Sequence, residues 1–153
     1  MKRKQTVKYY LAYGSNLNIE QMALRCPGAK VIGPTSLNGY RLVFRGMPGN
    51  THATVEAAPG HTVPVLLWRI TAADEAALDR YEGAPRYYLK EYVLVKINND
   101  VHPALIYVMV PGRKLGEPGE IYYDTIKVGY EAAGFDISIL ESARQVSSRR
   151  KQR

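Results

Sequence analysis

The chain has 153 residues, 46% of them hydrophobic and 23% charged, which is the size and composition of one globular domain. No apolar stretch reaches the ~20 residues that a membrane-spanning helix needs. The basic start of the chain lacks the small-residue cleavage site of a signal peptide. Cys26 is the single cysteine, which excludes an internal disulfide bond and is typical of a reducing compartment. We therefore expect a cytoplasmic protein that makes no membrane contact.

The net charge of +7 comes from the two ends of the chain. Seven of the 21 Lys and Arg residues lie at these ends, and the remaining 14 balance the 14 Asp and Glu residues. We expect a basic tail over residues 1–6, a single domain over residues 7–145 and a second basic tail over residues 146–153. Basic tails can contact nucleic-acid phosphates weakly and in a salt-dependent way, but most are solvated chain ends.

The chain begins with a predicted strand and a short helix. Val7–Tyr13 is rich in Val and Tyr, and this composition predicts a strand that ends at Gly14. Asn18 is a suitable cap for a short helix from Ile19 to about Arg25.

Four further strands are predicted before the next helix, at residues 29–37, 39–46, 52–60 and 62–70. Asn38 and Gly39 predict a tight hairpin between the first two, because both turn positions favour positive φ. Pro59 and Gly60 end the third strand. The fourth is an apolar run long enough to be a buried strand.

A central helix is the clearest element of the second half. Thr71 is a suitable cap, Asp74 and Glu75 complement the positive helix end, and Gly83 stops the helix. The later elements are a strand at 87–97, a turn at 98–100, a strand at 102–110, a loop at 111–120, a helix at about 121–133, and a last helix capped by Asp136 that ends near residue 144. This order predicts the α+β class, with a mainly antiparallel sheet that can close into a barrel.

Residues suited to metal, nucleotide or nucleophile chemistry are scattered along the chain. His52, His61 and His102 lie apart in predicted loops and strand ends, and Cys26 has no Cys or His partner at metal-ligand spacing. The sequence contains no GxGxxG, no phosphate-binding loop with Lys and no G-x-S-x-G. Ser15 follows a glycine, but no histidine can be placed beside it. We expect neither a metal nor a cofactor.

Glu82 is a candidate general acid or base. It lies at the end of the central helix, where the negative helix end disfavours a carboxylate. Leu78 and Tyr81 make its surroundings partly apolar, so both effects predict a raised pKa, as acid–base catalysis at neutral pH needs. The alternative is a solvated glutamate beside a helix stop.

The turn at Gly14, Ser15 and Asn16 has two interpretations. Small hydrogen-bonding residues are common in turns. The backbone N–H groups of such a turn can also form a small anion site.

Four segments occur in the order of a known family. They are YLAYGSNL near the start, LDRYEG in the middle, YYLKEYVLV just after it, and GEIYYDTIKVGYEAAGF near the end. Together they resemble the γ-glutamylcyclotransferase-like family, over about residues 9–140. The resemblance implies a small mixed, mainly antiparallel β-barrel flanked by α-helices, with a cavity at one end.

The resemblance also implies a reaction. Characterised members cyclise a γ-glutamyl amide: the α-amine of the substrate attacks its own γ-carbonyl, 5-oxoproline forms and the free amine is released. The implied substrate is a small γ-glutamyl amine or γ-glutamyl amino acid. The Glu of the family's Glu-Gly motif is the base and acid, which maps onto Glu82. The implied substrate-binding residues are Tyr13, Gly14, Ser15, Asn16, Leu17, Tyr88 and Tyr122, with Tyr107 as a weaker candidate.

Three hypotheses follow from the sequence. The first is this enzyme, which would release 5-oxoproline. The second is a non-catalytic small-molecule binding protein that uses the same pocket without forming product. The third is a nucleic-acid-associated protein whose salt-sensitive binding is lost when residues 1–4 and 149–153 are deleted.

Overall fold

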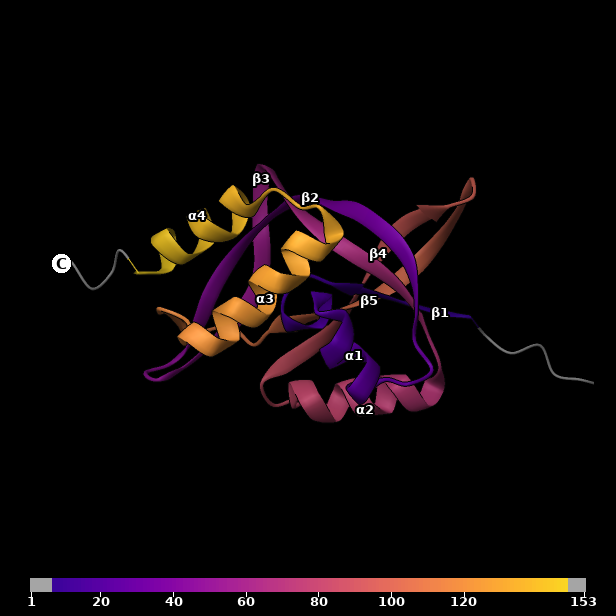
Figure 1. The fold of residues 1–153 in the computed structure, drawn as a ribbon, viewed down its shortest axis with the longest axis horizontal. Coiled ribbons are helices and arrows are strands. Elements are labelled where there is room, and N and C mark those ends of the chain that lie inside the picture. Colours follow the sequence, from indigo (N-terminus) through magenta and orange to yellow (C-terminus); the bar gives the residue numbers. More distant parts are fainter. Residues whose placement is uncertain (1–6, 149–153) are drawn as a thin grey trace, which may run out of the picture.

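The computed structural model describes residues 7–148, so residues 1–6 and 149–153 of the two predicted tails lie outside the described residues. The elements in chain order are β1 (Lys8–Ala12), the short 3₁₀ helix η1 (Ser15–Leu17), α1 (Ile19–Arg25), β2 (Lys30–Met47), β3 (Asn50–Ile70), α2 (Ala72–Glu82), β4 (Tyr88–Ile97), β5 (Asp100–Met109), β6 (Lys114–Leu115), α3 (Glu120–Ala133) and α4 (Ile137–Ser148). Figure 1 shows how they are arranged.

The strands form one curved sheet in the order β4-β5-β1-β3-β2-β6. All neighbouring pairs are antiparallel except β1 and β5, which are parallel. The sheet makes a half-barrel flanked by helices: α4 packs on β2, α3 packs on η1 and α4, and α1 packs on α2 (Figure 1). The predicted α+β class and mixed, mainly antiparallel sheet are confirmed.

The predicted hairpin at Asn38 and Gly39 is wrong. Both residues lie inside β2, which pairs with β3 along its whole length and turns at Pro48-Gly49 instead. The register shifts at Gly39, where the partner of β2 changes from Thr62 to Ala57, so both strands bend there. An Asn-Gly pair makes a tight turn only where the two segments beside it pair with each other, and here both pair with β3.

Asn98 and Asn99 form the two-residue turn that was predicted between β4 and β5. Both have positive φ, 49° and 72°, as a type I′ turn requires. β5 starts at Asp100, slightly earlier than expected. The predicted loop over residues 111–120 contains the short strand β6, which pairs with β2.

The predicted helices are confirmed together with the residues that cap them. The Asn18 side chain accepts a bond from the amide of Gln21 at 3.1 Å. Thr71 and Asp74 form a reciprocal capping box, with distances of 3.0 and 3.1 Å. Asp136 Oδ1 accepts a bond from the amide of Ser138 at 3.0 Å.

Helix α4 runs further than expected and belongs to the folded domain to its end. Ser147, assigned from sequence to the C-terminal tail, is 1% exposed. Its hydroxyl accepts a bond from the amide of Phe44 in β2 and donates to the Ala143 carbonyl, both at 2.8 Å. Residues 146–148 therefore extend α4 over the sheet.

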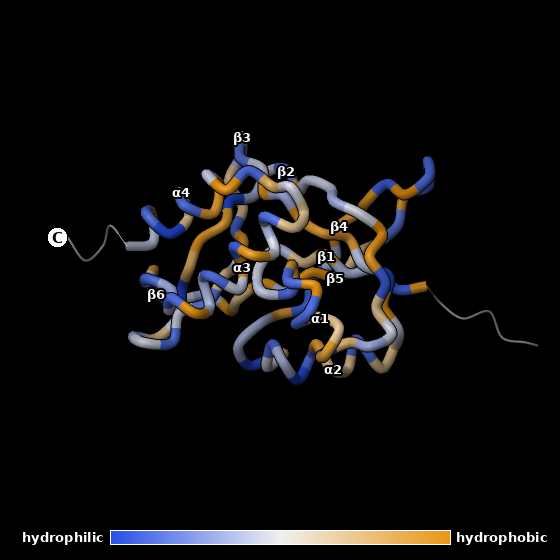
Figure 2. Tube along the Cα trace, viewed as in Figure 1, coloured by the Kyte–Doolittle hydropathy of each residue, from blue (hydrophilic) through white to orange (hydrophobic). Residues whose placement is uncertain are grey.

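Apolar side chains concentrate between the sheet and its helices. Figure 2 shows hydrophobic segments along the strands in the middle of the molecule, whereas the tip of the β4–β5 hairpin is largely hydrophilic. None of the helices in residues 7–148 has both the length and the apolar character needed to cross a lipid bilayer.

Candidate functional site

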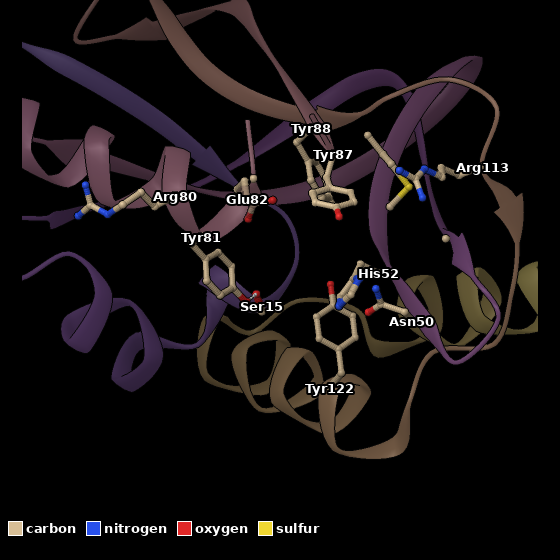
Figure 3. A pocket seen from close by; sticks show the side chains of 13 residues that line it. Ser15, Asn50, His52, Arg80, Tyr81, Glu82, Tyr87, Tyr88, Arg113 and Tyr122 are labelled. Atoms are coloured by element: carbon tan, nitrogen blue, oxygen red, sulfur yellow. Dashed lines mark hydrogen bonds between the residues drawn. The ribbon is translucent and has the colours of Figure 1, made fainter. Parts of the chain in front are cut away.

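Glu82 is the last residue of α2, and the chain turns sharply after it. Gly83 has a φ of 66°, which favours glycine, and its amide donates to the Arg80 carbonyl at 3.3 Å. The amide of Ala84 donates to the Asp79 carbonyl at 3.0 Å, which completes a Schellman motif. A Cβ atom on Gly83 would lie 2.6 Å from the Tyr87 ring. This turn ends the helix so that the Glu82 side chain faces a cavity (Figure 3).

The cavity has a volume of about 320 Å³ and is built from segments far apart in the sequence. Its lining comes from η1, the β2–β3 turn region, the end of α2, the start of β4, the segment after β5 and the start of α3. The lining residues are Ser15, Gly46, Asn50, His52, Arg80, Tyr81, Glu82, Gly83, Tyr87, Tyr88, Met109, Arg113 and Tyr122.

A recess of about 20 Å³ continues the cavity toward the turn after β1. Its lining residues are Tyr10, Tyr13, Gly14, Ser15, Asn16, Ala53, Glu82, Tyr88, Tyr107 and Tyr122. The recess shares Glu82 and Ser15 with the main cavity. Glu82 and the turn at residues 14–16 therefore line the same recess.

The turn at residues 14–16 offers backbone donors to this hollow. The amides of Leu17 and Asn18 donate to the carbonyls of Gly14 and Ser15, each at 3.0 Å. The amides of Ser15 and Asn16 have no acceptor within residues 7–148, although both residues are buried. A Cβ atom on Gly14 would lie 3.3 Å from the Ala53 Cβ, so glycine also lets the turn pack closely on β3.

Side chains hold this turn from two sides. The hydroxyl groups of Ser15 and Tyr81 lie 2.8 Å apart, and the Asn16 amide group donates to the Tyr10 hydroxyl at 2.9 Å. Arg25, from α1, donates to the Asn16 side-chain oxygen, and its guanidinium carbon lies 3.4 Å from the centre of the Tyr81 ring. One arginine thus links the turn to the end of α2.

Two tyrosines of the cavity are anchored by the backbone of Ala53. Tyr88 donates its hydroxyl to the Ala53 carbonyl at 2.7 Å, whereas Tyr122 accepts a bond from the Ala53 amide at 2.9 Å. The Tyr122 hydroxyl therefore keeps its hydrogen available for a ligand. Tyr13 donates to the Tyr107 carbonyl at 2.6 Å, and the Tyr107 hydroxyl donates to Asp79 at 2.6 Å.

Burial raises the pKa of Glu82 to about 7, while the nearby positive charge of Arg25 acts in the opposite direction. The predicted rise in the pKa of Glu82 is thus confirmed. Burial also raises the pKa of the Tyr13 and Tyr88 hydroxyls well above the usual value, so they stay neutral donors at pH 7. Burial lowers the pKa of His52, which favours a neutral imidazole.

The structure brings together every residue proposed from sequence for the site except Leu17. Leu17 lines neither the cavity nor the recess and is 1% exposed. It packs beneath the turn against α3, where a Cβ atom on Gly129 would lie 2.6 Å from the Leu17 Cβ. Tyr107, the weaker candidate, borders the recess.

Several lining residues were not found from the sequence. His52 was considered only as a metal ligand, yet its ring centre lies 4.9 Å from that of Tyr122 in the cavity wall. Asn50 and His52 are two residues apart, the spacing that places strand residues on one face, so this signal was available. Arg25 and Arg113 carried no such signal, because only the tertiary fold brings them to the site. Among the described residues, no group of three or more His, Cys, Asp or Glu could hold a metal ion.

Comparison with curated proteins finds similarity over part of the chain. The gamma-glutamylcyclotransferases of Bos taurus and Homo sapiens are each 33% identical to it over 81 residues, which is 48% of this chain. The matched region spans 43% of the length of those relatives.

Solved structures share the fold over most of the chain. One described as a gamma-glutamyl cyclotransferase superposes with a TM-score of 0.78 at 24% identity, covering 90% of this chain and 86% of the other. An uncharacterized protein from Homo sapiens superposes with a TM-score of 0.77 at 25% identity and the same coverage.

The model of the family described as gamma-glutamyl cyclotransferase, AIG2-like, matches residues 10–125, which contain the turn at 14–16, Glu82 and both anchored tyrosines. The chain therefore belongs to the gamma-glutamyl cyclotransferase, AIG2-like family.

Proposed function

We propose that this protein cyclises a γ-glutamyl amine or γ-glutamyl amino acid to 5-oxoproline and releases the free amine. The observation that carries the proposal is a buried carboxyl group with a pKa of about 7, Glu82, which shares a hollow with the amides of Ser15 and Asn16. The names of the related proteins support the same reaction.

In the proposed reaction Glu82 both accepts and donates protons. Its carboxylate first takes a proton from the α-ammonium group of the substrate, and the freed amine attacks the γ-carbonyl carbon to form a new C–N bond. When the tetrahedral intermediate collapses, the protonated Glu82 gives its proton to the departing nitrogen and the original amide C–N bond breaks. The Glu82 carboxylate then accepts the second proton of the ring nitrogen, which leaves the neutral lactam, and passes that proton to the released amine or to water. A pKa near 7 suits both transfers, because either protonation state is accessible at neutral pH.

Donors beside Glu82 suit the negative charge that develops on the γ-carbonyl oxygen. The amides of Ser15 and Asn16 have no acceptor within residues 7–148, and the Tyr122 hydroxyl keeps a hydrogen to donate. Donors already held in place stabilise an oxyanion without reorganising during the reaction. The same amides could instead hold the α-carboxylate of the glutamyl part.

The intramolecular nature of the attack also accelerates the proposed reaction. Attack within one molecule through a five-membered ring can reach effective molarities of roughly 10⁵–10⁸ M when the geometry is right. The protein then needs chiefly to fold the glutamyl chain so that amine and carbonyl meet. The recess of about 20 Å³ beside Glu82 has room for one small group of that chain, such as a single oxygen atom.

The decisive test replaces Glu82 by Gln and measures 5-oxoproline release from γ-glutamyl amino acids, ε-(γ-glutamyl)lysine and γ-glutamyl amines. We expect turnover by the wild type and a loss of roughly a hundredfold or more in Glu82→Gln, because the amide can neither accept nor return the proton. Glu91→Gln, on the exposed side of β4, is the matched control and should keep full activity.

Two results would contradict the proposal. Full activity in Glu82→Gln would remove Glu82 from the proton transfers. Saturable binding of these compounds to the wild type without any product would favour a non-catalytic binding protein.

A further inference from the structure

The cavity extends away from Glu82 to an end where Arg113 lies. Figure 3 shows the Arg113 side chain beyond Tyr87 as seen from Glu82, with Asn50 and His52 on the wall below. This part of the cavity has no role in the proton transfers proposed above. The positive charge of Arg113 at this end of the cavity indicates which chemical group the departing amine carries.

Arg113 is held in place by its neighbours. Its guanidinium carbon lies 5.4 Å from the centre of the Tyr87 ring, within the range of a cation–π contact. Its backbone carbonyl accepts a bond from Arg45 at 2.9 Å, and Arg45 is itself bonded to Glu56 at 2.9 Å. The segment that carries Arg113 is therefore tied to β2 and, through Glu56, to β3.

The Arg113 guanidinium has no carboxylate partner within residues 7–148. Arg41 and Arg45, by contrast, both pair with Glu56, so each of these two arginines has a carboxylate partner, although one carboxylate neutralises only one of the two charges. Arg113 is only partly exposed, which makes an unpaired guanidinium there a binding group for an anion.

The other charges around the cavity do not satisfy Arg113. Burial lowers the pKa of His52 and thus favours its neutral form. Glu82 faces the recess, and Figure 3 places Tyr87 between it and Arg113. Arg80, the other arginine of the lining, extends away from the cavity in the same view. The far end of the cavity therefore carries an uncompensated positive charge.

We propose that Arg113 binds a carboxylate on the amine portion of the substrate and so selects γ-glutamyl amino acids over γ-glutamyl amines that lack an acid group. This inference rests on the proposed function, which places the glutamyl part between the turn at 14–16 and Glu82. The departing nitrogen then lies at Glu82, and its substituent extends along Tyr87 toward Arg113. Asn50 can donate a second hydrogen bond to the same carboxylate.

The experiment uses pairs of compounds that differ only in the carboxylate. One pair is γ-glutamylalanine and γ-glutamylethylamine, and the other is γ-glutamyl-4-aminobutyrate and γ-glutamylpropylamine, which places the acid further from the reacting nitrogen. For the wild type we expect a higher kcat/KM with the acid of at least one pair. Arg113→Gln should lower kcat/KM for that acid roughly tenfold or more and leave its neutral partner close to wild type, because a hydrogen bond to a charged group is lost.

Two further variants separate charge from structure. Arg113→Lys keeps the positive charge and should restore part of the preference for the acid. Arg69→Gln, on the exposed side of β3 away from the cavity, is the matched control and should leave both members of each pair unchanged.

Binding of the intact compounds to the Glu82→Gln variant, measured by calorimetry, distinguishes failure of this inference from failure of the proposed function. Tighter binding of the acid, lost in the Glu82→Gln, Arg113→Gln double variant, supports the inference even if no compound is turned over. Equal effects of Arg113→Gln on both members of every pair would overturn it, since Arg113 would then hold the glutamyl part or the fold. No effect on any compound would also overturn it.

Discussion

Arg25 reaches the site from α1, although it lines neither the cavity nor the recess. It contacts the Asn16 side chain and the Tyr81 ring, and its charge opposes the rise in the pKa of Glu82. The groups that face Glu82 from other elements are neutral tyrosine hydroxyls, including those of Tyr13 and Tyr122. Arg25 is therefore a positioning residue whose charge also lowers the pKa of Glu82 against the larger effect of burial.

Arg25→Gln should move the acidic limb of the pH–rate profile to higher pH. The base form of Glu82 is needed for the first proton transfer, so kcat/KM rises as pH passes the pKa of Glu82. Removing the positive charge that lowers the pKa of Glu82 in the wild type should raise that pKa. The measurement is kcat/KM for 5-oxoproline formation between pH 5 and 9.

Arg25→Lys provides the control for this prediction, because it keeps the charge but not the flat guanidinium over Tyr81. The acidic limb of the Arg25→Lys profile should stay near that of the wild type even if the maximal rate falls. If Arg25→Gln and Arg25→Lys shift the acidic limb equally, Arg25 acts through packing and not through charge.

Helix α3 positions the turn at residues 14–16 by packing on η1. Gly129 makes this possible, because a Cβ atom there would lie 2.6 Å from the Leu17 Cβ and 2.7 Å from the Leu17 carbonyl carbon. Backbone atoms cannot give way as the end of a flexible side chain can. The turn that carries the free amides is thus held by a close contact between two elements.

We expect Gly129→Ala to lower stability and activity together. The added methyl group overpacks the contact, which typically costs roughly 1–3 kcal/mol of unfolding free energy, despite the better helix propensity of Ala. The displaced turn should also lower kcat/KM. Urea unfolding and 5-oxoproline release measure the two effects. Lys127→Ala, on the exposed side of α3, should change neither, and the prediction fails if Gly129→Ala behaves like it.

For the whole molecule, ionisation of Glu82 lowers the free energy of unfolding as pH rises toward neutral and above. The pKa of Glu82 is about 7 in the folded protein, against an ordinary value of 4.5. Between these values the folded state binds more protons than the unfolded state, so the unfolding free energy falls as pH rises from about 4.5 to 7. Above pH 7 the full cost applies, on the order of 3 kcal/mol for this shift.

Glu82→Gln should therefore have a higher free energy of unfolding than the wild type at pH 8. The difference between the two proteins should be much smaller at pH 5. Glutamine stays neutral at both values and avoids the cost of burying a charge. Urea unfolding at the two pH values measures the difference. Glu91→Gln should show no such dependence, and an equal gain of Glu82→Gln at both pH values would contradict the ionisation of a buried Glu82.

Local signals in the sequence were enough for the helices and for one turn. Asn18, Thr71 and Asp136 cap helices through bonds to residues two or three positions away, and Gly83 ends α2 by its own conformation. Asn98 and Asn99 both have positive φ in a two-residue turn. Each of these features depends on a few neighbouring residues, and so a single sequence reveals it.

The fold class, the helix ends and the raised pKa of Glu82 were all predicted from the sequence, although burial in the folded protein is the main cause of that raised pKa. Only the folded chain established the long β2–β3 pairing that replaced the Asn38-Gly39 turn. It also brought His52 and Arg113 to one cavity and Arg25 against Tyr81 at its border. These two groups of features differ in the distance along the chain over which they are decided. Capping and turn preferences act within a few residues, whereas strand register and the lining of a cavity depend on which distant segments bury their apolar faces together.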